Sequence, residues 1–103
     1  MKTISSQRFI DDEIVAAKRC ARDYTVTVSP IFKIDGEDHR AVIDGHHSFE
    51  AAKIDGVKPN FVEASVQTDD RIFLLQNGAI DDYLELCWMD DDWYDINTGR
   101  GIF

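Results

Sequence analysis

One stretch decides the fold of this chain, and it reads Val42-Ile43-Asp44-Gly45-His46-His47-Ser48-Phe49-Glu50-Ala51-Ala52-Lys53. Val42 and Ile43 are β-branched and suit a buried strand. Gly45 permits a sharp turn or the close approach of a ligand to the backbone. Residues 48–53 are mostly good helix formers, with Phe49, Ala52 and Lys53 at helical spacing. The stretch therefore predicts a strand, a glycine turn and a helix over about 47–54.

The predicted turn is a candidate anion site. The first N–H groups of a helix have no intrahelical acceptor, and the helix dipole adds positive potential beside them. The side chains of His46, His47 and Ser48 fall at this position and can all donate hydrogen bonds. We therefore predict the small-molecule site at Asp44, Gly45, His46, His47 and Ser48.

The segments before this turn predict a helix and several strands. A helix is expected over 11–22, with its apolar face formed by Ile10, Ile14, Ala17 and Ala21. Acidic residues crowd its first turn, and Lys18, Arg19 and Arg22 crowd its last turn. That arrangement complements the helix dipole, and the basic group is alternatively a phosphate-contact patch. Extended segments are expected at 3–8, at 24–28, and as a hairpin of 31–34 with 40–43.

The segments after the turn predict a strand, a helix and a terminal hairpin. Gly56 and Pro59 end the central helix, so a strand over 60–66 is expected to complete a β-α-β crossover. Residues 72–75 are apolar and fit either state, while 79–88 reads as a helix. Residues 90–92 read as a solvated loop, and 93–103 as a hairpin. Together these elements predict one α+β domain over 1–103 with a small mixed β-sheet.

Charge and cysteine content narrow the partners and the compartment. The net charge is −9, and residues 67–103 carry nine acidic residues against two arginines. This acidity disfavours direct binding to duplex DNA and favours either simple solubility or a basic protein partner. No apolar run is long enough to span a membrane, and no signal peptide is evident, so we expect a cytoplasmic protein. Cys20 and Cys87 are expected to be buried or half-buried free thiols, with a single disulfide between them as the alternative.

From about Ser29 to Val66 the sequence resembles the ParB/sulfiredoxin superfamily, which includes the ParB-like nuclease domains. The resemblance rests on spaced motifs, namely Ser29-Pro30-Ile31, Ala41 to Lys53 with its Ala51-Ala52 pair, Asp55-Gly56-Val57 and Phe61-Val62-Glu63. Free-standing single-domain members of this kind resemble proteins of phages, prophages and plasmids. The resemblance implies an α+β fold followed here by an acidic C-terminal extension, 67–103.

The resemblance also implies a nucleotide site. In partition proteins the corresponding signature grips the phosphates of a cytidine nucleotide, and in sulfiredoxins it serves ATP-dependent repair of an oxidised cysteine. Here Gly45 matches the turn glycine, and His46 stands at the glutamate or catalytic cysteine position. His47 matches the following Arg or His, and Ser48 replaces the usual arginine. The resemblance thus implies CTP or ATP as ligand, with Mg²⁺ if a nucleotide binds, and a weaker phosphate grip than arginine would give.

Three functional interpretations remain open from the sequence. His46 and His47 are candidate catalytic residues of a ParB-like nuclease or nucleotide hydrolase, because histidine exchanges protons near neutral pH. Alternatively, the fold is a scaffold for an acidic interaction module, an inhibitor or regulator that in its extreme form mimics DNA. A third interpretation gives Asp44 a helix-capping role and both histidines structural hydrogen bonds. No metal site is predicted, because no third ligand follows from spacing, although His39 is a conceivable one.

Overall fold

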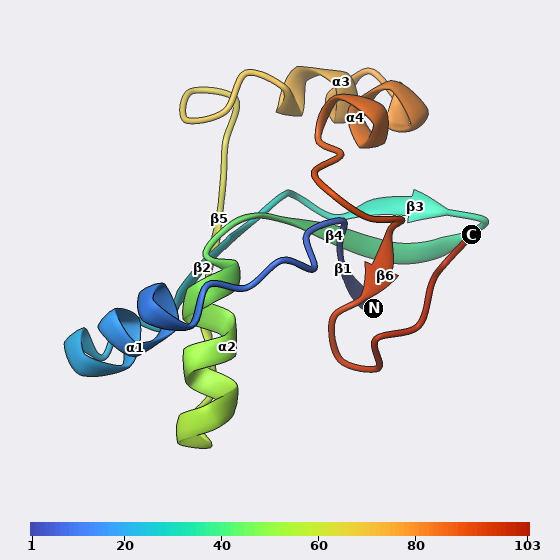
Figure 1. Cartoon of the computed structure of the whole chain (residues 1–103). Coiled ribbons are helices and arrows are strands. Elements are labelled where there is room, and N and C mark those ends of the chain that lie inside the picture. Colours follow the sequence, from blue (N-terminus) through green and yellow to red (C-terminus); the bar gives the residue numbers. More distant parts are fainter.

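The computed structural model describes all residues, 1–103, as an α+β fold with a mixed six-stranded sheet and four helices. Figure 1 shows α3 and α4 above the sheet, with α1 and α2 together below one end of it. In chain order the elements are β1 (Lys2–Ser5), α1 (Asp12–Ala21), β2 (Thr25–Val28), β3 (Phe32–Ile34), β4 (Glu37–Asp44), α2 (His46–Asp55), β5 (Asn60–Glu63), α3 (Ile72–Gln76), α4 (Ile80–Leu86) and β6 (Tyr94–Asp95). The predicted α+β class is confirmed.

The central strand is β4, which pairs with three others. β1 lies parallel to it on one edge, and β2 and β3 lie antiparallel to it. β2 and β3 are successive pieces separated by Pro30, which cannot donate to a ladder. The Ser29 hydroxyl accepts the N–H of Ala41 at 2.9 Å, and this hydrogen bond joins the segment between β2 and β3 to β4. A hairpin forms as predicted, but its register differs. Residues 32–34 pair with 37–39 and not with 40–43, because the later part of β4 pairs with β1 and β2.

The predicted β-α-β crossover is wrong. β5 does not pair with β4, but runs parallel to β2, which is itself antiparallel to β4. The reason is that both edges of β4 are already occupied, whereas β2 has a free edge. The N–H of Asn60 donates to the carbonyl of Tyr24 at 2.8 Å and begins this pairing. Strand β5 ends at Glu63, three residues before the predicted end.

Helix α1 forms where predicted but buries a different face. Its one buried residue is Val15, while Ile14 and Ala17 from the predicted face are exposed. The helix packs mainly on α2, which lies beside it in Figure 1. Because α1 packs on one neighbouring helix, only a narrow stripe of its surface is buried, and Val15 lies in that stripe. The prediction failed because periodicity alone does not say which of two moderately apolar faces meets a partner.

The core lies on both faces of β4. Ala41 belongs to a cluster with Ile4, Phe32, Leu84 and Trp93, which joins the sheet to α4. Val42 points the other way, as alternation along a strand requires, and packs with Val26 and Val28. Partly buried Phe49 and Ile96 complete this second cluster.

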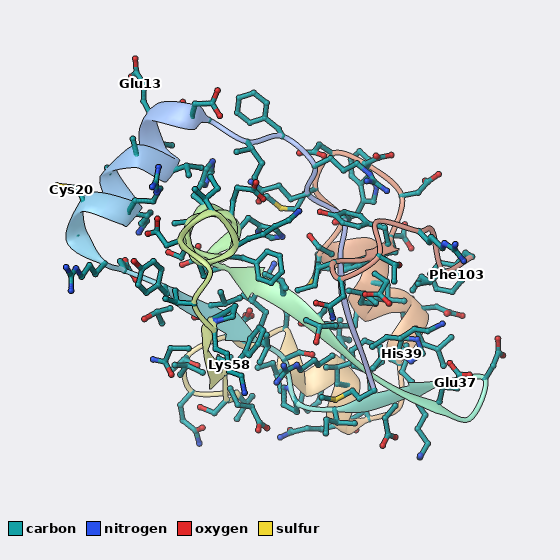
Figure 2. The ribbon with its side chains drawn as sticks, turned by 90° about the horizontal axis from the view of Figure 1, so that it is seen from below. Glu13, Cys20, Glu37, His39, Lys58 and Phe103 are labelled. Atoms are coloured by element: carbon teal, nitrogen blue, oxygen red, sulfur yellow. The ribbon has the colours of Figure 1, made fainter.

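The C-terminal segment closes over β1. Strand β6 pairs antiparallel with β1, and a bridge between Tyr94 and Gly101 confirms the predicted terminal hairpin. Residues 72–75, which the sequence left undecided, are helical. No helix has the length and apolar character that crossing a membrane requires. Both cysteines are free; Cys87 is half-buried as expected, but Cys20 is exposed and points away from the body in Figure 2.

Candidate functional site

Gly45 is required for packing between α2 and β2. Its φ is +96°, in the left-handed region that side chains rarely adopt. A Cβ atom at this position would lie 2.5 Å from the carbonyl oxygen of Thr25 and 2.9 Å from the Cα of Val26. The β2 backbone therefore fills the space beside Gly45, and no room for a ligand is left there.

The backbone at the start of α2 presents unsatisfied donors. The N–H groups of His46, His47 and Ser48 donate to no protein acceptor, and no side chain caps the helix. Asp44 does not cap α2, because its carboxylate instead accepts the N–H of Gly45 at 2.8 Å. Three free N–H groups at the positive end of a ten-residue helix form a local donor set for an anion.

His46 turns toward β1. Its Nε2 lies in short hydrogen-bond contact with the hydroxyl of buried Ser5. That hydroxyl also accepts the N–H of Gln7 at 3.0 Å. Burial, and secondly the proximity of His47, lower the pKa of His46 to about 4, although Asp44 and Asp90 act in the opposite direction. The imidazole is therefore neutral at pH 7 and a weak base.

His47 turns to the other side of the helix axis, toward α1. Its Nε2 accepts the backbone N–H of Asp11 at 3.1 Å, so its own proton is carried on Nδ1. Asp11 is the N-cap of α1, and its carboxylate accepts the N–H of Glu13 at 2.9 Å. The contact of His47 thus fixes the start of α1 against the start of α2.

A polar recess of about 190 Å³ lies on the His47 side of the turn. Four of the five predicted site residues line it, namely Asp44, Gly45, His47 and Ser48. Ser48, one of these four residues, is only 1% exposed. The fifth, His46, lines a separate cavity between α2 and the C-terminal segment. The structure therefore divides the predicted site between two concavities.

Four residues of the recess come from outside the predicted turn, namely Lys18, Asp23, Thr25 and Thr27. Lys18, at the end of α1, is the only cation that lines it, and it pairs with Asp23 at 3.0 Å. Lys18 belongs to the basic group at 18–22 that the sequence singled out. Arg19 instead pairs with Asp55, and Arg22 ends α1. Asp23 was not predicted from the sequence. It lies in the link between α1 and β2, where its carboxylate pairs with Lys18 and accepts the N–H of Thr25 at 3.1 Å.

The acidic segment is partly used for internal contacts. The carboxylate of Asp90 accepts the N–H of Arg8 at 2.8 Å, and Asp91 pairs with the Arg8 guanidinium at 2.6 Å. These two residues therefore tie the 6–10 arm to the C-terminal segment, and 90–92 is not simply a solvated loop. Trp93 is buried in the core, whereas Trp88 is exposed.

No group of three or more histidine, cysteine or acidic side chains is arranged to hold a metal ion. His39 is buried, and its Nδ1 lies 2.8 Å from the carbonyl of Glu37. It is therefore not a partner for the turn histidines. Searches against protein-family models, curated proteins and solved structures found no match to this chain.

Proposed function

We propose that the protein is a ParB-like domain that binds a phosphate group, carried by a nucleotide such as CTP or ATP, at the start of α2. The observation that carries this proposal is the set of three free N–H groups at the start of α2, next to a recess that Ser48 helps to line. Lys18 adds a positive charge to the same recess. The resemblance of residues 29–66 to the ParB/sulfiredoxin superfamily supports the same ligand class.

The geometry favours weak binding. A recess of about 190 Å³ is smaller than the roughly 300–1,000 Å³ of sites that enclose a drug-sized ligand, so it suits one phosphate group. Asp23 and Asp44 line it against the single cation Lys18, and the whole chain carries −9. This charge balance opposes a polyanion. We expect dissociation constants on the order of 1 mM, equivalent to about 4 kcal/mol.

An NMR titration tests this proposal. Inorganic phosphate, CTP and ATP, each with and without Mg²⁺, should shift the amide signals of residues 45–48 at millimolar concentration. Ser48→Ala should weaken the response several-fold, whereas Ser65→Ala, a change at an exposed serine outside the recess, should not. Amide signals of 45–48 that stay unmoved in all titrations would end the proposal.

A nuclease or nucleotide hydrolase is less well supported by the histidine contacts. Nε2 of His47 already accepts a backbone N–H, and the low pKa of His46 makes it an inefficient general base at pH 7. Turnover of plasmid DNA, CTP or ATP that disappears in His47→Ala, with folding intact, would establish this alternative. Binding without turnover would support the nucleotide-binding proposal alone.

An acidic interaction module is the second candidate, and exposed apolar residues favour it. Leu86, Trp88 and Met89 are all more than half exposed. The acidic residues of α4 that precede them form no ion pair; these are Asp81, Asp82 and Glu85. An aromatic anchor rimmed by free carboxylates suits a basic protein surface.

The interaction candidate predicts salt-sensitive capture of a basic protein from host extract. Trp88→Ser should abolish that capture, whereas Phe73→Ser, at an equally exposed residue of α3, should retain it. Identical recovery by wild type and Trp88→Ser would remove this candidate.

A further inference from the structure

A second concavity lies on the His46 side of the turn and shares no residue with the polar recess. Its volume is about 310 Å³, which falls at the lower end of the range for small-molecule sites, roughly 300–1,000 Å³. One wall is a face of α2, with His46, Phe49, Glu50 and Lys53, and the opposite wall is the segment 94–99.

The apolar part of this cavity belongs to the protein core. Val42, Phe49 and Ile96 line it, and all three belong to the core cluster that Val42 forms with Val26 and Val28. The wall opposite α2 is held in place, because the Tyr94 hydroxyl donates to the Gln7 carbonyl at 2.6 Å. The Arg8 guanidinium also stacks on the Tyr94 ring at 3.9 Å. The cavity is therefore formed before any ligand arrives, which lowers the entropic cost of binding.

The polar part of this cavity contains one cation that no carboxylate pairs. Two cations, Arg8 and Lys53, line it against one carboxylate, Glu50. Arg8 is already engaged by Asp91 and by the Gly99 carbonyl. Lys53 forms no ion pair and lies in the last turn of α2. A ligand anion at the rim would therefore meet an unpaired ammonium group.

We propose that this cavity binds a small monoanion with an apolar body, of the class of aromatic or branched-chain carboxylates. The carboxylate pairs with Lys53, and the apolar body contacts Phe49 and Ile96. The imidazole of His46, whose Nε2 contacts the Ser5 hydroxyl, also lines this cavity. This inference goes beyond phosphate binding and depends on none of the free N–H groups of α2.

The ligand's charge and size follow from the lining. A single unpaired cation, Lys53, beside the carboxylate of Glu50 favours a monoanion over a triphosphate. A cavity of about 310 Å³ accommodates a body about the size of one aromatic ring. A neutral analogue loses the pairing with Lys53, and a cationic analogue meets repulsion from it.

Three probes with the same aromatic ring and different charge test the proposal, namely benzoate, benzyl alcohol and benzylamine. In NMR titrations of the intact chain, benzoate should shift the signals of Phe49, Lys53 and Thr98 with an affinity that exceeds those of the other two probes. Lys53→Met should lower the affinity for benzoate about threefold to fivefold, as expected for an exposed ion pair, and leave the affinity for benzyl alcohol unchanged. Glu50→Gln should raise the affinity for benzoate.

The matched control is Lys58→Met. Lys58 is also exposed and unpaired, and lies in the link between α2 and β5, as labelled in Figure 2. This variant should bind benzoate like the wild type. Equal benzoate affinity in Lys53→Met and wild type, or shifts confined to residues outside the cavity, would overturn the proposal. Ser48→Ala leaves this cavity intact, so failure here is distinguishable from failure of phosphate binding.

Discussion

Replacing Gly45 with alanine tests whether α2 begins in direct backbone contact with β2. The added Cβ atom would lie 2.5 Å from the Thr25 carbonyl oxygen and 2.9 Å from the Val26 Cα, both rigid backbone atoms. A left-handed conformation costs an alanine roughly 1–2 kcal/mol. Overpacking typically adds about 1–3 kcal/mol. We therefore expect Gly45→Ala to lower the free energy of unfolding by about 2–5 kcal/mol.

Gly56→Ala is the matched control. Gly56 has φ of +67°, but a Cβ atom there would meet nothing within 4 Å. Gly56→Ala should lower the free energy of unfolding only by the cost of the left-handed conformation, roughly 1–2 kcal/mol. Urea unfolding measures both losses in free energy, provided that the variants keep the m value of the wild type. A domain of this size has a total stability of about 5–15 kcal/mol, so the larger loss is easily resolved. Equal losses at Gly45 and Gly56 would refute the close contact with β2.

Three further predictions concern His46, the cap of α1 and the two cysteines. Since the folded pKa of His46 is about 4, below the usual 6.5, the unfolded chain binds more protons between these values. The free energy of unfolding should fall by about 1–2 kcal/mol from pH 7 to pH 5, and urea titrations of His46→Gln should lack this component. Asp11→Ala should cost about 1 kcal/mol in thermal unfolding by removing the cap of α1, with α2 unaffected. Iodoacetamide followed by mass spectrometry should modify exposed Cys20 first, because burial raises the pKa of the Cys87 thiol; equal rates would contradict this.

Local patterns in the sequence predicted the elements around the turn well. The strand–glycine–helix order of 42–54, the hairpin of β3 with β4 and the terminal hairpin all depend on neighbouring residues and turn chemistry. Each of these is present. The exposed position of Ile14 and the pairing of β5 with β2 were not predictable in the same way. The first depends on which face of α1 meets α2, and the second depends on the edges of β4 being already occupied.

The candidate site could likewise be predicted from the sequence only in part. The sequence located the turn, but the partners of its two histidines lie 41 and 36 residues away along the chain. No spacing rule connects His46 with Ser5 or His47 with Asp11. The separation of the two histidines was foreseeable, because adjacent residues of a helix do not face each other. What each one meets depends on the path of the arm between β1 and α1.

That arm gives the turn its particular chemistry. It runs from Ser5 to Asp11, and successive histidines of α2 hold its two ends. The side chains that look most reactive are thereby used to position β1 and α1 around the start of α2. The groups that could contact an anion are backbone N–H groups and the Ser48 hydroxyl, together with Lys18, which is already paired with Asp23. A site built mainly from backbone donors keeps its position when surface side chains change, but it lacks the fixed charge of arginine that tight phosphate binding uses.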